Sequence, residues 1–248
     1  MKFLLKAIRF SRANAHLLIL FILLSFGVIP FQIIRYRGYT NGFLLMVFWI
    51  AAFIATKFFI SGIYSIAWNN FTGSKLQTSS LVQESKRYFK SVIGIEIVIA
   101  VIYGIANFAL VIILRKIFYP DISFADFYKS IVVIMLQQFT LFLFTLFFIY
   151  AIPFIFVTDK NAGDALSSSY KFLIRNIAVS APVVFLWVVA STFSVVLTSF
   201  ARKYGYNANE YWLITGASYV IWYVVQFIVF LVASQVLSDK YFSRNSNE

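Results

Sequence analysis

Ionisable side chains fall within, or at the start of, long apolar stretches of the sequence. Lys57 lies inside the second such stretch, Glu96 lies about one turn into the third, and His16 stands at the start of the first. Each charge costs on the order of 3 kcal/mol near the centre of a bilayer, and much less near its surface. Ionisable residues in such positions are therefore the first candidates for chemistry.

Lys57 and Glu96 carry opposite charges, and a long lysine side chain can reach a carboxylate on a neighbouring helix. With His16 nearby, a buried Lys57–Glu96 pair could gate a path or relay protons. The alternative is that the two residues pair structurally or extend towards the inner headgroups, which are common outcomes for such side chains. The sequence favours this alternative and leaves the proton relay open.

Amide side chains also fall within the apolar stretches, and Gln226 lies near the middle of its stretch. Such amides usually form hydrogen bonds between helices, and less often line a polar lumen. We therefore expect them to join helices, and we keep a polar lumen as the alternative. The amides are Asn107, Gln137, Gln138 and Gln226.

Residue types that support enzymatic or metal chemistry are scarce in this sequence. It has no cysteine and a single histidine, which excludes thiolate sites and multi-histidine metal sites. It also has no glycine-rich phosphate loop, no Ser-His-Asp constellation and no acidic pair in an apolar stretch. We therefore predict that the protein is not an enzyme and that it binds neither a metal nor another cofactor.

The elements that position these residues follow from composition. Of the 248 residues, 61% are hydrophobic and only 12% are charged, and the mean hydropathy is +0.85. Because a transmembrane helix needs about 20 mostly apolar residues, the sequence predicts an all-α polytopic membrane bundle in one domain, residues 1–248, with no soluble domain. The six predicted spans are 15–34, 43–67, 92–114, 130–157, 177–200 and 211–237.

The net charge of +12 is better explained by membrane topology than by nucleic acid. Lysine and arginine are concentrated at the N-terminus, in the second and fourth connections, and in the C-terminal tail. This bias predicts a multi-pass protein of the cytoplasmic (inner) membrane with both ends in the cytoplasm. If Lys57 marks the inner edge of the bilayer, residues 58–70 form a cytoplasmic extension of the second span instead of part of it.

Three stretches of the sequence, 4–24, 82–102 and 166–186, resemble one another. Each has a polar start, an aromatic residue, a basic residue and then an apolar span, which is also what any positive-inside helix start looks like. We interpret them as cytoplasmic amphipathic helices, each preceding one of three helical hairpins and resting on anionic lipid headgroups. The candidate headgroup-binding residues are Lys2, Lys6, Arg9, Arg12, Lys90 and Arg175.

The third stretch has the most specific pattern. Pro153 precedes an acidic turn, and Ala165, Leu166 and Ser169 then begin a new helix. With the six-span layout, this pattern resembles a group of bacterial six-helix integral membrane proteins that includes the membrane domain fused to glycerophosphoryl diester phosphodiesterases. The resemblance implies a fold and not an activity. We do not assign the phosphodiesterase activity to this chain.

Three classes of function remain open on this sequence. The basic amphipathic helices and the scarcity of catalytic motifs favour a non-enzymatic protein that organises the membrane or binds lipid or a membrane-protein partner. Lys57, Glu96 and the amides support, as the alternative, a small transporter or channel subunit. A lipid-acting enzyme is a remote third, supported only by membrane location.

Overall fold

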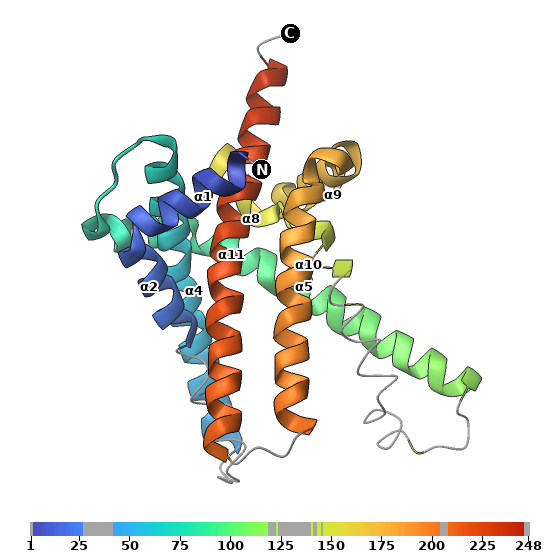
Figure 1. The fold of residues 1–248 in the computed structure, drawn as a ribbon. Coiled ribbons are helices and arrows are strands. Elements are labelled where there is room, and N and C mark those ends of the chain that lie inside the picture. Colours follow the sequence, from blue (N-terminus) through green and yellow to red (C-terminus); the bar gives the residue numbers. More distant parts are fainter. Residues whose placement is uncertain are drawn as a thin grey trace.

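The computed structural model describes residues 2–26, 42–118, 146–203 and 208–245, and also residues 123, 140, 143 and 144. All regular elements in this part of the chain are helices, which confirms the all-α prediction (Figure 1). They are α1 (Lys2–Ala13), α2 (Ala15–Phe26), α4 (Gly42–Thr72), the 3₁₀ helix η1 (Thr78–Ser80), α5 (Leu81–Phe118), α8 (Ala151–Thr158), α9 (Ala162–Arg175), α10 (Ile177–Lys203) and α11 (Ala208–Asn245).

Several of these helices are long and apolar enough to cross a membrane. Three qualify alone, within α4, α5 and α11. Two bent pairs, α1 with α2 and α9 with α10, raise the number to five if each pair counts as one span. The described residues therefore fit a multi-pass membrane protein. Residues 130–139, 141, 142 and 145 of the predicted span 130–157 lie outside the described residues, as do residues 27–34 of the first span. The arrangement of six spans in three hairpins stays a prediction.

Both bent pairs turn at an asparagine. α1 meets α2 at 86° around Asn14, and α9 meets α10 at 109° around Asn176. Each asparagine side chain donates a hydrogen bond of 3.1 Å to the carbonyl of the phenylalanine four residues earlier, Phe10 or Phe172. The same carbonyl also accepts from the main-chain N–H of the asparagine, so the side-chain amide adds a second hydrogen bond at the end of the short helix.

The second of the similar stretches has no such break. Ile93, not asparagine, follows Phe89 by four residues, and α5 runs as one helix from Leu81 to Phe118. The short amphipathic helix expected before the second hairpin is therefore the first part of α5 and not a separate element. An isoleucine side chain has no donor with which to cap a carbonyl, so nothing there favours a turn.

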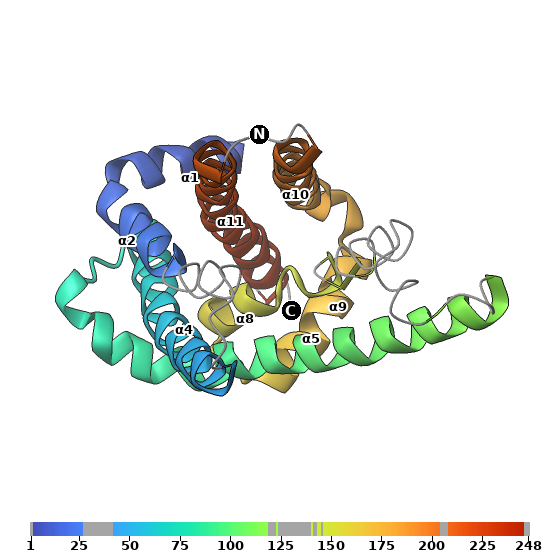
Figure 2. The ribbon, with the colours of Figure 1, turned by 90° about the horizontal axis from the view of Figure 1, so that it is seen from below.

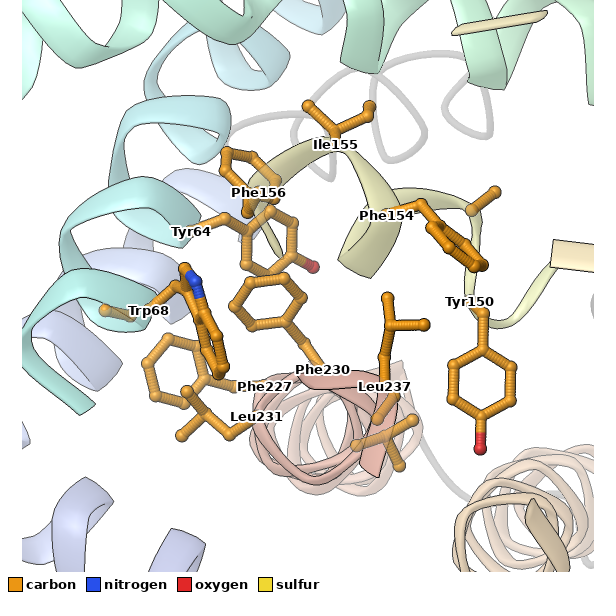
Figure 3. Packing of buried hydrophobic residues seen from close by; sticks show 14 of the residues in the cluster. Tyr64, Trp68, Tyr150, Phe154, Ile155, Phe156, Phe227, Phe230, Leu231 and Leu237 are labelled. Atoms are coloured by element: carbon orange, nitrogen blue, oxygen red, sulfur yellow. The ribbon is translucent and has the colours of Figure 1, made fainter. Parts of the chain in front are cut away.

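The hydrophobic core lies where α4, α8 and α11 meet. Figure 3 shows the rings of Tyr64, Phe156 and Phe230 gathered between these helices, and Tyr64 and Phe230 have ring centroids 4.2 Å apart. α4 is buried on all sides from Ile60 to Trp68, whereas its first half is largely exposed. Residues 58–70 thus continue α4 without a break and are enclosed by the other helices.

The second half of α5 extends away from the other described helices (Figure 2). Only 11% of the most apolar window of this helix is buried, and its exposed side chains include Ile105, Phe108, Ile113 and Ile117. Aliphatic and aromatic side chains of this kind are suited to contact with lipid tails. This half of α5 therefore has the surface of a lipid-facing span.

The turn between α8 and α9 uses the chemistry that the sequence indicates. Asn161 caps α9 by accepting a hydrogen bond of 3.0 Å from the main-chain N–H of Asp164. Asp159 adopts the left-handed conformation, with φ of 53°, and thereby ends α8. Pro153 lies in the first turn of α8, where no helical hydrogen bond needs its missing N–H.

Ser169 joins α8 to α9. Its hydroxyl donates to the carbonyl of Phe147 over 3.0 Å and accepts from the N–H of Tyr150 over 3.2 Å. Ser169 is buried, together with Ala165 and Leu166. One hydroxyl thus satisfies two main-chain groups just before α8 begins, so the Ala-Leu-x-x-Ser pattern has a structural role.

We expect Ser169→Ala to lower the free energy of unfolding by about 2 kcal/mol, because it leaves two main-chain groups without their partner. The matched control is Ser167→Ala, since Ser167 is exposed on the same helix. Unfolding of the full chain in mixed micelles measures both. Equal stability of the two variants would show that the Ser169 hydroxyl does not hold α8 in place.

Candidate functional site

The structure brings Lys57 and Glu96 together. Lys57 lies at the middle of α4 and Glu96 lies on α5, and Lys57 Nζ donates a hydrogen bond of 2.7 Å to Glu96 Oε1. Both side chains are 23% exposed, and Lys57 Nζ also lies 5.4 Å from the ring centroid of Phe53. The pair therefore forms an ion pair within an apolar part of the bundle.

This ion pair lines a cavity of about 230 Å³, whose walls come from α2, α4, α5, α8, α10 and α11. Gln226 of α11 lines the same cavity, so three of the four predicted intramembrane residues meet at one place. Most of the remaining wall is aliphatic or aromatic, including Tyr64 and Trp187. The result is an apolar chamber with a small number of polar groups, which is the usual form of a ligand site.

Two polar groups of the cavity have no hydrogen-bond partner among the described residues. The hydroxyl of Ser25 is buried and unpaired, and the structure gives the Gln226 amide no hydrogen bond within the described part of the chain. We expected Gln226 to join helices, but in the described residues it lines the cavity instead. Unpaired polar groups are costly in an apolar site unless water or a ligand satisfies them.

His16 does not belong to this cavity. Its side chain is exposed at the start of α2, whereas its neighbour Leu17 is buried and Phe21, one turn later, lines the cavity. The helical repeat explains the difference, since the face that carries Leu17 and Phe21 points inward and His16 points outward. His16 therefore does not line the cavity with Lys57 and Glu96, and the structure gives no support to the expectation that it lies near them.

A second candidate site lies on α1, across the end of the bundle where α9 also lies (Figure 1). Ala7 and Ser11 of α1 are buried, and Lys2, Arg9 and Arg12 are exposed. The helix thus has a small buried face and exposed basic side chains, and its role as an amphipathic membrane-surface helix stays a prediction. Its exposed side also carries apolar side chains, Leu5 at 46% and Ile8 at 37% exposure.

Lys6 fixes α1 to the last helix. Its ammonium donates a hydrogen bond of 2.9 Å to Gln235 of α11 and lies 4.3 Å from the ring centroid of Phe71. Gln235 in turn donates to Asp239 over 2.5 Å. Lys2, Lys6 and Arg9 line a surface cavity of about 720 Å³ beside these residues, so three bases face one acid there.

The other predicted headgroup-binding residues are also exposed. Lys90 lies on α5, and Arg175 lies in the last turn of α9 together with exposed Lys171. Like α1, α9 has a buried face, formed by Ala165, Leu166, Ser169 and Leu173. Two short helices, α1 and α9, thus present basic side chains at one end of the bundle.

Sequence reasoning missed Ser25, Gln235 and Asp239. Gln235 and Asp239 are four residues apart, a spacing that places both on one face of a helix and could have suggested a contact with the basic N-terminal helix. Ser25 carries no such signal, because a serine in an apolar stretch usually bonds to its own helix.

Comparison of the chain with protein-family models, with curated proteins and with solved structures finds no match. The resemblance to the membrane domain fused to glycerophosphoryl diester phosphodiesterases therefore stays a prediction.

Proposed function

We propose that the protein is a non-enzymatic protein of the cytoplasmic membrane that binds anionic phospholipid headgroups through α1 and α9 and so organises the lipid or protein partners around it. Both ends of the chain lie in the cytoplasm in this proposal, with α1 and α9 on the inner surface. The observation that carries it is the 86° bend between α1 and α2, which supports a flat position for α1 beside a membrane-crossing helix.

The side chains of α1 support this position. Lys2, Arg9 and Arg12 are exposed next to Leu5 and Ile8, so one surface offers cations for phosphate groups and short apolar side chains for the acyl boundary. Interfacial helices combine these two features. Each base near an anionic membrane surface contributes about 1 kcal/mol.

Replacing Lys2, Arg9 and Arg12 together with glutamine should weaken the preference for anionic lipid by about tenfold or more, because three such contributions are removed. Electron paramagnetic resonance of spin-labelled phosphatidylglycerol and phosphatidylcholine, in vesicles that contain the full chain, measures the relative association of the two lipids. Lys6 is left unchanged in this variant because it fixes α1 to α11.

The matched control replaces Lys75, Lys86 and Lys116 with glutamine. These lysines are exposed and lie outside α1, so the variant loses the same charge elsewhere. It should keep most of the preference for phosphatidylglycerol. An equal loss in both triple variants would mean that net charge, and not α1, selects the lipid.

The cavity around Lys57 and Glu96 favours a second candidate function, that of a small transporter or channel subunit. Its specific support is that an ion pair, Gln226 and Ser25 line one chamber within the bundle. Flux of a solute or of protons through vesicles that contain the chain, abolished by Lys57→Leu with insertion intact, would favour this candidate over the first.

A further inference from the structure

The cavity has balanced charges. Lys57 and Glu96 are the only lysine, arginine, aspartate or glutamate among the described residues that line it, so its net charge is zero. A ligand with a single net charge would bring an uncompensated charge into largely apolar surroundings, which is unfavourable. The cavity therefore matches a ligand with no net charge better than a simple cation or anion.

The polar groups of the cavity can still form hydrogen bonds. Lys57 Nζ forms one side-chain hydrogen bond, to Glu96, and an ammonium group has three donors. The Gln226 amide and the Ser25 hydroxyl, which have no described partner, can donate and accept. A ligand that carries both a strong acceptor and a strong donor would satisfy these groups together.

Aromatic rings form much of the wall close to the ion pair. Tyr64 packs against Phe21, with ring centroids 5.4 Å apart, and against Phe230, with centroids 4.2 Å apart, and all three residues line the cavity. The faces of such rings attract ammonium groups, the more so where water is excluded. An ammonium group beside Glu96 would therefore meet favourable surroundings on more than one side.

We propose that the Lys57–Glu96 cavity binds a small zwitterion with a phosphodiester and an ammonium group, of the kind that glycerophosphoethanolamine carries as a free molecule and phosphatidylethanolamine carries as a lipid headgroup. The phosphodiester lies against Lys57, and the ammonium group lies against Glu96 and the aromatic wall. The charges of the zwitterion then run opposite to those of the ion pair. This inference goes beyond headgroup binding by α1 and requires no transport.

The test uses the full chain with Lys2, Arg9 and Arg12 replaced by glutamine, so that α1 does not contribute anionic lipid. This chain is exposed in detergent micelles to equal amounts of phosphatidylethanolamine and phosphatidylglycerol, and mass spectrometry counts the lipid that stays bound. A parallel titration uses soluble glycerophosphoethanolamine, whose phosphodiester and ammonium leave no net charge. Binding of the soluble compound with the same dependence on Lys57 and Glu96 assigns recognition to the zwitterion alone. Binding of only the lipid, with that dependence, assigns it to the headgroup with its acyl chains.

Glu96→Gln should change the binding of the two lipids in opposite directions. The variant leaves the cavity with one net positive charge, so bound phosphatidylethanolamine should fall and bound phosphatidylglycerol should rise, which reverses the preference. With Lys2, Arg9 and Arg12 restored, α1 should add phosphatidylglycerol to the total, but Glu96→Gln should shift the ratio in the same direction. A chain with the three α1 substitutions that shows no preference for phosphatidylethanolamine, or a ratio that Glu96→Gln does not alter, would overturn the proposal.

Gln226→Leu keeps the ion pair and tests the same site if the charge variant does not fold. It removes hydrogen bonds to a charged ligand, so affinity should fall by about tenfold. Asn107→Leu is the matched control, because Asn107 is an amide on α5 that does not line the cavity. Unchanged affinity in Gln226→Leu, or an equal loss in both variants, would contradict binding in this cavity.

Discussion

Replacing Lys57 with leucine should lower the free energy of unfolding by about 2 kcal/mol, because removal of one partner from a partly buried ion pair leaves the other charge uncompensated in apolar surroundings. Glu96 would then keep a carboxylate in the cavity without the ammonium that now lies 2.7 Å away. Unfolding of the full chain in mixed micelles measures the loss.

A double variant separates the effect of the uncompensated Glu96 charge on stability from the effect of lost side-chain packing. Lys57→Leu with Glu96→Leu removes both charges, and its stability should return close to that of the wild type, since an apolar pair of similar volume often replaces a buried ion pair without loss. The ion pair between Arg87 and Asp159 is the matched control. Its side chains are 58% and 67% exposed, so Arg87→Gln should cost less than about 1 kcal/mol. A double variant less stable than Lys57→Leu would contradict this account of the pair.

Gly62→Val should cost about 3 kcal/mol or more, because α5 leaves no room for a side chain at Gly62 of α4. A Cβ at this position would lie 2.6 Å from the main-chain carbonyl oxygen of Leu81 and would also overlap the Ser85 hydroxyl. The backbone of a packed helix cannot move aside cheaply, so the two helices would have to separate. Such a separation would also disturb the Lys57–Glu96 contact, which joins the same helices.

Gly104→Val gives the matched control for that prediction. Gly104 lies on α5, and a Cβ there would meet nothing within 4 Å, so the same substitution should change stability by less than about 0.5 kcal/mol. Thermal unfolding of both variants in one detergent compares them directly. Similar melting temperatures would show that α4 and α5 do not depend on close packing at Gly62.

The sequence left open whether Lys57 and Glu96 pair or extend to the inner headgroups, because either outcome satisfies opposite charges in neighbouring apolar stretches, and the structure shows that they pair. The helical repeat of α1 places its basic residues together on one face, and the structure exposes them. These features depend on local pattern and on simple charge pairing. Neither needs knowledge of how distant helices are rotated.

Other features depend on the rotation and contact of distant helices, which no local pattern specifies. Gln226 lines the cavity with Lys57 because of how α11 is rotated about its axis, and His16 points outward because of how α2 is rotated. The bends at Asn14 and Asn176 form an intermediate case. The Phe-x-x-x-Asn spacing is visible in the sequence. Its link to a bend becomes clear only from the structure, because α5 has Ile93 at the equivalent position and does not bend there.

The depth of α1 in the bilayer tests the central claim most directly. The chain has no cysteine, so Ile8→Cys on α1 and Lys75→Cys, on the exposed segment before η1, each give one site for a spin label. Quenching by lipid-soluble oxygen and by a water-soluble nickel complex reports the depth of each label. We predict that the label at position 8 lies at headgroup level, and more deeply in phosphatidylglycerol than in phosphatidylcholine vesicles, while the label at position 75 stays in water. Equal access of water to both labels in both kinds of vesicle would contradict lipid binding by α1.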